Sequence, residues 1–443
     1  MSKRLKAAKI EDLEFEGLIQ NKEAKIGIVG LGYVGLPLLL EFAKSGFTVT
    51  GIDIDTQKVK LLEKGKSYIQ DVSDKELNPF IEMKRINPTS SFEVIERLDA
   101  VIICVPTPLV KTKDPDLSHV VSAAKEIKKW LGKGQLIILE STTYPGTTEE
   151  IVLPILSEKG KKVGRDFFLA FSPERVDPGN QEFQIQNTPK IVGGVTPFCT
   201  KLATQLYQSI VKKVIPVSST MVAEMVKLLE NTFRSVNIAL VNEVALLSNK
   251  LGIDVWEVID AAATKPFGFM PFHPGPGIGG HCIPVDPFYL SWKAKQNGFE
   301  ARFIELAGKI NGSMPEHVVN KITESLNDRS KSVRNSKLLV LGVAYKKDID
   351  DIRESPALDI LALLFKLGAN LSYHDPYVPS LNVVNQILSS VNISKNPIKN
   401  YDCVIIVTNH SSFDYEMVVK ESQLIIDTRN ALKGFRQPHI VRL

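Results

Sequence analysis

The spacing of apolar residues predicts two separate runs of alternating strands and helices. From Lys25 the sequence KIGIVGLGYVGLPLLLEFAKSGFTVTGIDID is typical of a strand, a glycine turn, a helix that stops at Gly46, and a second strand ending at Asp53. Further apolar runs follow at 99–108, 134–142 and 190–194, with a helical pattern at 118–134. Together these segments predict one parallel, doubly wound sheet that closes near residue 210.

The middle of the chain has a different pattern. The segment STMVAEMVKLLENTFRSVNIALVNEVALLSNKLGI keeps helical periodicity for longer than the usual globular helix, and we expect it to join two domains. A helical pattern at 254–263 leads into a Pro- and Gly-rich loop, 266–287, and more helix follows up to about Asp328. Functional residues tend to lie on such irregular loops.

From Lys337 the strand, loop, helix and strand pattern starts again. Gly368 is the predicted helix stop, and the second strand ends at Asp375. Apolar runs at 402–410 and 423–430 add two strands. The first turn has lysines where the N-terminal domain has glycines, so we expect the two domains to hold different ligands.

The predicted fold class is α/β, with two Rossmann-like doubly wound domains joined by a long central helix and a helical middle domain. A length of 443 residues supports about three units at ~150 residues each. The predicted boundaries are an N-terminal arm or short amphipathic helix over 1–23, a cofactor-binding domain over 24–212, a helical domain over 213–330, and a second α/β domain over 331–443.

Composition excludes several classes of protein. The chain is 44% hydrophobic and 23% charged, which is ordinary for a globular protein. A net charge of +4, with lysines interleaved among acids, predicts no nucleic-acid partner. The N-terminus lacks an apolar signal core, and no apolar run approaches the ~18 residues of a membrane span, so we expect neither export nor membrane insertion. Four cysteines far apart, without CxxC, predict no disulfide framework, no metal site and a cytoplasmic location.

A glycine turn predicts dinucleotide binding. The motif GxGxxG lies directly after a strand and before a helix, where a helix N-terminus can face a pyrophosphate. Asp53 follows about 20 residues on and suits the ribose hydroxyls of NAD rather than the 2′-phosphate of NADP. A turn without ligand is the weaker hypothesis. Lys58 is either a cap on the adenosine end or a solvated surface charge. The turn residues predicted to contact NAD are Gly30, Gly32, Tyr33, Val34 and Gly35.

One cysteine stands apart from the other three. Cys104 and Cys403 belong to apolar strand patterns and Cys199 to a helical one, so each is explained as a small buried hydrophobe. Cys282 follows two glycines, which expose backbone amides, and precedes a proline and Asp286. A helix N-terminus or an adjacent charge there would activate a thiolate. On the motif alone, a nucleophile and a cysteine without a role are comparable hypotheses.

The long helix carries a polar stripe. Glu224, Lys227, Asn231 and Arg234 recur at spacings of three, four and three, which places them on one face. Apolar residues such as Leu229 lie elsewhere on the helix. A solvated face explains the stripe as well as a functional one does.

Five separated motifs resemble the UDP-glucose/GDP-mannose dehydrogenase family: GLGYVGLP, FSPERVDPGN, AEMVKLLENTF, GIGGHCIPVDP and GVAYKKDIDDIRESPA. The resemblance runs from about Lys25 to Arg429 and is strongest to bacterial UDP-N-acetylglucosamine 6-dehydrogenases of surface-polysaccharide pathways. It implies a four-electron oxidation, in which the CH2OH group of a UDP-sugar becomes a carboxylate while two NAD+ are reduced. It also implies a homodimer or a higher homo-oligomer.

The resemblance assigns roles to individual residues. Cys282 matches the nucleophile that forms a thiohemiacetal and then a thioester. Lys227 and Asn231 match groups that stabilise an oxyanion, and Asp286 with Lys227 and a water matches a base network. Glu174 matches a general acid/base, although a surface Ser-Pro-Glu is the alternative. The implied catalytic residues are Cys282, Lys227, Asn231, Asp286, Glu174 and Thr142. The further cofactor contacts are Thr107, Thr142 and Arg353, and the substrate contacts are Glu174, Arg175, Lys227, Asn231, Gly277, Tyr345, Lys346 and Arg429.

Three departures from the family pattern weaken UDP-glucose as substrate. UDP-glucose dehydrogenases commonly have a lysine where Val285 stands and a small polar residue in place of His281, and Arg175 follows Glu174 where phenylalanine is the alternative. UDP-glucose, UDP-N-acetylgalactosamine and UDP-N-acetylmannosamine remain alternative substrates. Two other classes remain as well. A two-electron β-hydroxyacid-type dehydrogenase predicts one NADH per substrate and no role for Cys282. A non-catalytic sugar-nucleotide sensor predicts ligand-induced stabilisation without turnover.

Overall fold

The computed structural model describes residues 15–69, 71–110, 114–175, 180, 182–280 and 282–443. His281 and residues 1–14 of the predicted arm therefore lie outside the described residues. The chain divides into two compact units, 1–230 and 231–443, and each is described in turn. The domain boundaries expected from the sequence pattern stay predictions.

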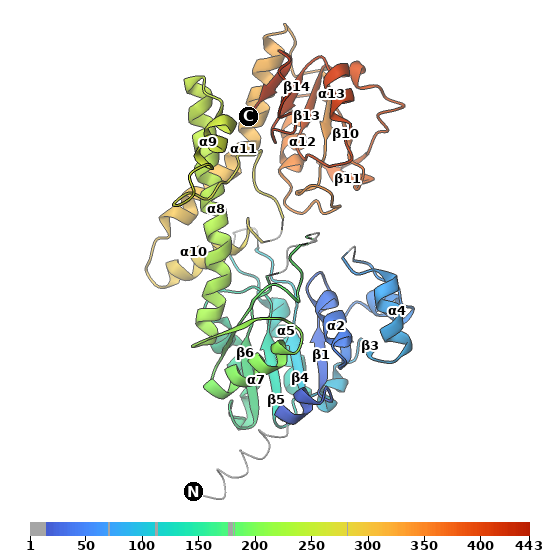
Figure 1. Cartoon of the computed structure of the whole chain (residues 1–443), viewed down its shortest axis with the longest axis vertical. Coiled ribbons are helices and arrows are strands. Elements are labelled where there is room, and N and C mark those ends of the chain that lie inside the picture. The colour runs from blue at the N-terminus through green and yellow to red at the C-terminus, as the bar shows by residue number, and fades with distance from the viewer. Residues whose placement is uncertain (1–14, 70, 111–113, 176–179, 181, 281) are drawn as a thin grey trace, which may run out of the picture. The chain divides into compact units, whose positions relative to one another are not determined.

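A sheet of eight described strands forms the first unit (Figure 1). The strands are β1 Lys25–Val29, β2 Thr48–Ile52, β3 Ile86–Thr89, β4 Ala100–Ile103, β5 Gln135–Leu139, β6 Phe167–Phe171, β7 Lys190–Gly194 and β8 Val214–Val217. Their order across the sheet is β3-β2-β1-β4-β5-β6-β7-β8. The chain therefore reverses its direction of winding between β1 and β4, the point where such sheets bind ligands.

The sheet differs from the prediction at its far edge. β7 pairs antiparallel with β6, so the prediction of an all-parallel sheet is wrong there. A parallel return requires a long crossover, usually helical, and the described residues of 172–189 contain no helix. β8 pairs parallel with β7 and extends the sheet beyond residue 212. Its sequence, VIPV, is too short and too exposed to have shown as an apolar run.

Helices cover both faces of this sheet. They are α2 Gly35–Lys44, α3 Thr56–Glu63, α4 Asp74–Glu82, α5 Ser118–Trp130, α6 Leu153–Leu156 and α7 Pro197–Gln208, with single turns η1 Phe92–Arg97, η2 Thr148–Val152 and η3 Glu158–Gly160. Ile28 of β1 packs in one core and the adjacent Val29 in another, as expected of a strand buried on both faces. Residues 15–20 are helical and place Phe15 and Ile19 in the first core, which confirms a packed helix for this part of the arm.

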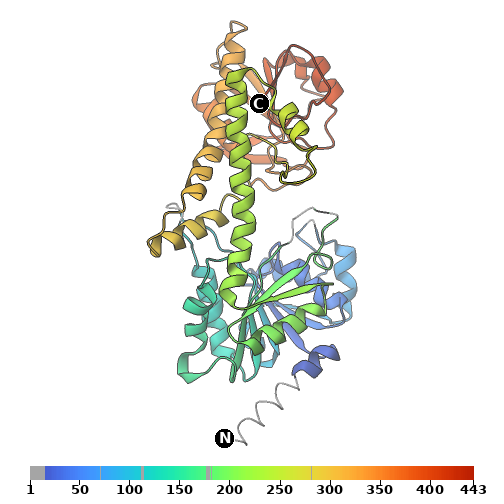
Figure 2. The ribbon, with the colours of Figure 1, turned by 60° about the vertical axis from the view of Figure 1, so that its left-hand side comes forward.

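The predicted long helix is present as α8, Thr220–Leu251, and begins in the first unit and ends in the second (Figure 2). Glu224, Lys227 and Asn231 are buried on it, whereas Leu229 is 57% exposed. The hypothesis of a solvated polar face is therefore wrong. Arg234, expected on the same face, is exposed. Because buried polar groups must be hydrogen-bonded to be tolerated, this polar face needs partners.

The second unit contains a five-stranded parallel sheet of order β10-β9-β13-β14-β15 among its described residues. The strands are β9 Lys337–Leu341, β10 Asn370–His374, β13 Cys403–Ile406, β14 Ile425–Asp427 and β15 Ile440–Arg442, and β11 Ser380–Val383 pairs with β12 Gln386–Ser389 in a hairpin. The helices are α9 Val255–Ala262, α10 Asp286–Gln296, α11 Arg302–Asn327, α12 Pro356–Lys366 and α13 Tyr415–Glu421, with the turn η4 Ile398–Asn400. No described helix has the length and apolar character needed to cross a membrane.

Candidate active site

The predicted functional residues of the first unit follow the carboxyl ends of its parallel strands. The glycine turn follows β1, and Asp53 follows β2. Thr107, Thr142 and Glu174 follow β4, β5 and β6. Because parallel strands point the same way, these positions share one edge of the sheet, on both sides of the β1/β4 switch point.

Each of the three glycines of the turn lacks a side chain for a different physical reason. Gly30 has φ +92°, and a Cβ there would lie 2.6 Å from the carbonyl oxygen of Cys104. A Cβ on Gly35 would lie 1.9 Å from the carbonyl oxygen of Gly30, so helix and strand approach too closely for any side chain. A Cβ on Gly32 would meet nothing within 4 Å. This open side lets a ligand approach the backbone, and the turn fits a dinucleotide pyrophosphate.

Asp53 is buried, and part of its acceptor capacity is used by the backbone. Oδ2 accepts the N–H of Leu31 in the glycine turn at 2.8 Å, and Oδ1 accepts that of Asp55 at 2.9 Å. A carboxylate has about four lone-pair positions, so acceptor capacity is left for ribose hydroxyls. Lys58 Nζ lies 3.8 Å from Oδ2. Lys58 therefore lies near Asp53, and its role as a cap on the adenosine end stays a prediction.

Glu174 lies in a buried charged cluster. Lys190 Nζ is 3.4 Å from Glu174 Oε2 and pairs more closely with Glu140 Oε1. Glu140 also accepts a hydrogen bond from the hydroxyl of Tyr207 through its other oxygen. Burial raises the pKa of Glu140 to about 8, with a further contribution from the nearby Glu174. Although burial opposes it, the two carboxylates raise the pKa of Lys190. The Glu174 side chain is only 12% exposed, so the surface Ser-Pro-Glu hypothesis is wrong.

The polar face of α8 is satisfied by the loops at the same sheet edge. Lys227 Nζ donates to the carbonyl oxygen of Glu174 at 2.7 Å. Glu224 accepts the backbone N–H groups of Gly146 and Thr148 and the Thr148 hydroxyl. Burial raises the pKa of Glu224 to about 7. These bonds tie α8 to the loop that begins at Thr142.

Arg175 has protein partners in the structure. Its Nε lies 3.3 Å from Glu230 of α8, and a terminal nitrogen donates to the carbonyl oxygen of Pro189 at 2.6 Å. A guanidinium has five N–H donors and these partners use three of them, so the contact with substrate stays a prediction.

Cys282 of the second unit lies at the start of a helix. Its carbonyl oxygen accepts the N–H of Asp286 at 2.8 Å, which turns the chain into α10. Asp286 is the first residue of α10, is buried, and accepts a hydrogen bond from Asn231 Nδ2. Cys282 is exposed, whereas Cys104, Cys199 and Cys403 are buried. A helix N-terminus favours a negative charge, so this end of α10 suits a thiolate.

The glycines of the cysteine loop serve close packing against the second α/β domain. A Cβ on Gly279 or Gly280 would lie 2.6 or 2.9 Å from atoms of Tyr345. Gly277 has φ +133°, and a Cβ there would lie 3.0 Å from Pro356. The amide of Gly280 donates to the carbonyl oxygen of Arg353 at 2.9 Å, so the expectation that this glycine exposes its amide is wrong.

Cationic groups of the second α/β domain border this loop. Arg429 donates from Nε to the carbonyl oxygen of Val407 at 2.8 Å, and one terminal nitrogen lies 2.8 Å from where a Cβ on Gly275 would be. Burial lowers the pKa of Arg429 to about 10, so it remains a cation at neutral pH. Among the described residues, no carboxylate forms an ion pair with Arg429. Lys346 is half-buried, and Arg353 is exposed and pairs with Asp351 at 2.7 Å.

Sequence reasoning missed Glu140, Lys190, Tyr207 and His410. Glu140 alone gave a signal, because it is a charged residue directly after the apolar run of β5. The other three lie far from it along the chain, and the partners of His410, described below, are equally distant in sequence.

The first unit has the geometry of an NAD-binding domain, and the second carries an exposed thiol in a loop that packs on an α/β domain with cationic side chains suited to a diphosphate. These features are typical of an NAD-dependent oxidoreductase that acts on a nucleotide substrate. Family models agree. The NAD binding, central and UDP binding domains of the UDP-glucose/GDP-mannose dehydrogenase family match residues 24–211, 221–313 and 339–434. The chain belongs to this family and is an NAD-dependent UDP-sugar 6-dehydrogenase.

Similar proteins differ in the sugar that their names give. A UDP-N-acetyl-D-glucosamine 6-dehydrogenase of Pseudomonas aeruginosa is 36% identical over 395 residues, which cover 88% of this chain and 92% of that one. The structure of a UDP-D-ManNAc dehydrogenase from Pyrococcus horikoshii has a TM-score of 0.86 at 35% identity, covering 94% of this chain and 98% of that one. An NDP-N-acetyl-D-galactosaminuronic acid dehydrogenase from Methanosarcina mazei has a TM-score of 0.80 at 32% identity, covering 97% of each chain.

Replacing Asp53 by Ala should weaken NAD+ binding by about tenfold or more, because two groups lose their acceptor: the ribose hydroxyls and the Leu31 N–H of the glycine turn. Titration calorimetry with NAD+ and, separately, with UDP measures both ligands. UDP affinity should stay within twofold of the wild type. Equal losses for the two ligands would contradict the assignment of Asp53 to the cofactor.

Proposed function

We propose that this enzyme oxidises the C6 hydroxymethyl group of UDP-N-acetylglucosamine to a carboxylate, through a covalent intermediate on Cys282. The observation that carries the proposal is the position of this exposed thiol, four residues before the start of α10 and in a loop packed on Tyr345 and beside Arg429. We infer that the product serves surface-polysaccharide synthesis, and a cytoplasmic location stays a prediction.

The chemistry balances as two oxidations and one hydrolysis. The alcohol loses a hydride and a proton to become an aldehyde. The Cys282 thiolate adds to the aldehyde carbon, and the resulting thiohemiacetal loses a second hydride to become a thioester. Water then cleaves the carbon–sulfur bond, giving the carboxylate and the thiol. The sum is one alcohol, two NAD+ and one water giving one carboxylate, two NADH and three protons.

The proposed roles of the side chains follow from their chemistry. The ammonium of Lys227 and the amide of Asn231 stabilise the oxyanion that forms at C6. Asp286, held by Asn231, belongs to the base network, and Glu174 handles protons during thioester hydrolysis. The proximity of Lys190 and Glu140 to Glu174 supports that role, because a buried cluster with two carboxylates and one cation has a proton to share.

Bound NAD+ supplies a hydride acceptor for each oxidation. The glycine turn and Asp53 hold its pyrophosphate and ribose, and Thr107 and Thr142 lie at the adjacent strand ends. Arg353 completes the proposed cofactor set. Tyr345, Lys346, Arg429 and Gly277 are the proposed nucleotide-sugar contacts of the second unit, and the half-buried, cationic Arg429 is the group best suited to a diphosphate.

The acetamido sugar is supported by the relatives and by the loop sequence. Two relatives named UDP-N-acetyl-D-glucosamine 6-dehydrogenase are 36% identical to this chain. A UDP-N-acetyl-D-mannosamine dehydrogenase of Pyrococcus horikoshii has the same identity, so UDP-N-acetylmannosamine is the second candidate. Val285 and Arg175 favour either of these acetamido sugars over UDP-glucose as the substrate.

Counting NADH per sugar tests the chemistry and the substrate together. The protein is incubated with excess NAD+ and a limiting amount of each UDP-sugar, and NADH absorbance is compared with sugar consumed. We expect two NADH per UDP-N-acetylglucosamine, and the highest kcat/KM for that sugar. Cys282→Ala should abolish acid formation, while Cys199→Ala, at a buried cysteine, serves as the control. A ratio of one, or an unchanged rate in Cys282→Ala, would contradict the thioester route, and ligand-induced stabilisation without NADH would indicate a sensor.

We further propose that the enzyme is a homodimer joined through α8. Apart from Val222, the exposed large apolar residues of this helix recur at spacings of four and seven: Met221, Met225, Leu229, Phe233, Leu240, Leu247 and Leu251. Burial of the polar face leaves this stripe on the outside. Monomeric proteins rarely expose a contiguous apolar patch of this kind, whereas homodimer interfaces are apolar.

Light scattering during size-exclusion chromatography tests the dimer. The wild type should have about twice the chain mass of 49.1 kDa, and Leu240→Glu/Leu247→Glu should shift it to one chain mass, because two charges would be buried in the interface. Leu367→Glu, at an exposed leucine after α12, is the matched control. A monomeric wild type, or a double variant that stays dimeric, would contradict this interface.

A further inference from the structure

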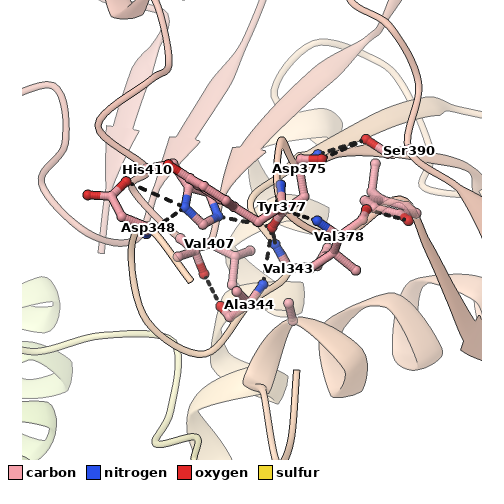
Figure 3. A network of polar contacts seen from close by, with 12 residues as sticks. Val343, Ala344, Asp348, Asp375, Tyr377, Val378, Ser390, Val407 and His410 are labelled. Atoms are coloured by element: carbon pink, nitrogen blue, oxygen red, sulfur yellow. Dashed lines mark hydrogen bonds and ion pairs between the residues drawn. The ribbon is translucent and has the colours of Figure 1, made fainter. Parts of the chain in front are cut away.

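A buried histidine of the second unit is bonded to the loop that carries the proposed substrate residues. His410 follows β13 and lies between Asp348 of the loop 343–353 and Asp375 after β10 (Figure 3). Its Nδ1 accepts the backbone N–H of Asp348 at 2.8 Å, and its Nε2 lies 3.0 Å from Asp375 Oδ2. Because Nδ1 is an acceptor, the ring proton is on Nε2 and is donated to Asp375.

Asp375 has no acceptor capacity left for a ligand. Besides His410, its backbone donors are Val343 and Ala344 to Oδ2 at 2.7 and 3.2 Å, and Tyr377 and Val378 to Oδ1 at 2.9 and 3.1 Å. A carboxylate offers about four lone-pair positions, so these five donors fill it. Asp53, at the corresponding place after β2, accepts two backbone N–H groups. The second α/β domain thus uses its strand-end carboxylate to fix the loop.

The segment that carries His410 holds the loop at further points. The carboxylate of Asp348 accepts the backbone N–H and the hydroxyl of Ser411 at 2.8 and 2.6 Å. Thr408 donates its hydroxyl to the carbonyl oxygen of Ala344. Asp348 has φ +64°, a conformation that a non-glycine residue keeps only when its surroundings hold it. Residues 408–411 therefore hold the loop on both sides of Tyr345 and Lys346.

The same loop supports the cysteine loop. The N–H of Tyr345 donates to the carbonyl oxygen of Asp351, and the N–H of Gly280 donates to that of Arg353. Tyr345 also packs so closely under Gly280 that a Cβ there would lie 2.9 Å from its ring. A shift of the loop therefore moves Lys346 and Tyr345 and also the backbone two residues before Cys282.

We propose that His410 is a positioning residue, which through its bond to the Asp348 backbone sets the loop 343–353 for the nucleotide sugar and, through Gly280, sets the cysteine loop. The proposal rests on the proposed function for the identity of the substrate. It does not require His410 to touch substrate or cofactor.

Two substitutions separate the two hydrogen bonds of the ring. In His410→Asn the side-chain oxygen takes the place of Nδ1, so the bond to Asp348 is kept and the donor to Asp375 is lost. In His410→Gln the amide nitrogen takes the place of Nε2, so the donor to Asp375 is kept and the bond to Asp348 is lost. His439→Gln is the matched control, because this histidine of the same unit bonds to the carbonyl oxygen of Val419.

Three measurements follow on the full-length protein: KM for the UDP-sugar and for NAD+, UDP affinity by calorimetry, and the alkylation rate of Cys282 by iodoacetamide with peptide mass spectrometry. The three buried cysteines are internal references for folding. We expect UDP to slow the alkylation of Cys282 in the wild type. His410→Gln should raise the UDP-sugar KM and the UDP Kd by about tenfold and should remove this effect of UDP on the alkylation rate. The NAD+ KM should rise less than the UDP-sugar KM, because Arg353 is the one proposed cofactor contact on this loop. His410→Asn should have the smaller effect, because it keeps the bond to Asp348.

An unchanged UDP Kd in His410→Gln would overturn the proposal. So would equal losses in both variants accompanied by an NAD+ KM raised as much as the UDP-sugar KM or by alkylation of the buried cysteines, because this pattern would mean general unfolding. UDP binding and alkylation need no turnover. Failure of the wild type to oxidise any UDP-sugar would therefore overturn the proposed function without deciding the role of His410.

Discussion

Burial of the polar face of α8 is the constraint on which the rest of the site depends. Glu224, Lys227 and Asn231 are withdrawn from water, and burial of such groups is tolerated only when each finds a partner. Glu224 accepts hydrogen bonds from backbone N–H groups that follow Thr142. Lys227 donates to the carbonyl oxygen of Glu174, and Asn231 donates to the carboxylate of Asp286. The partners are segments that carry proposed catalytic groups, so satisfying the helix also fixes these segments within each unit. Because the polar face of α8 is buried, its apolar face is exposed, and this exposed face is the proposed dimer interface.

The two α/β domains show how one topology serves two ligands. After β2, Asp53 keeps acceptor capacity next to a glycine turn that a ligand can approach. After β10, Asp375 is filled by four backbone donors and His410, and the adjacent turn carries Tyr345 and Lys346 in place of glycines. The first arrangement suits a ribose and a pyrophosphate held by backbone. The second fixes a loop whose side chains are the proposed ligand contacts.

The sequence predicted those parts of the structure that depend on local order. The glycine turn, Asp53 and the long helix follow from periodicity and spacing, because strand, turn and helix are contiguous there. The face of α8 that is buried did not follow, since a polar stripe is compatible with water or with partners. The antiparallel β7, the Glu140–Lys190 pair and the bonds of His410 join segments far apart in the chain, and pattern alone does not reveal such contacts. The roles of Cys282 and Glu174 came from family resemblance, and burial then removed the surface alternative for Glu174.

The central claim is that one thiol holds the sugar covalently through the second of its two oxidations. Acid quenching during turnover with UDP-N-acetylglucosamine and NAD+, followed by peptide mass spectrometry, tests it directly. The account predicts a UDP-sugar acyl adduct on the peptide containing Cys282, formed only when NAD+ is present. Turnover to the acid with no adduct on Cys282 under any quench time, or with the adduct on another cysteine, would contradict it.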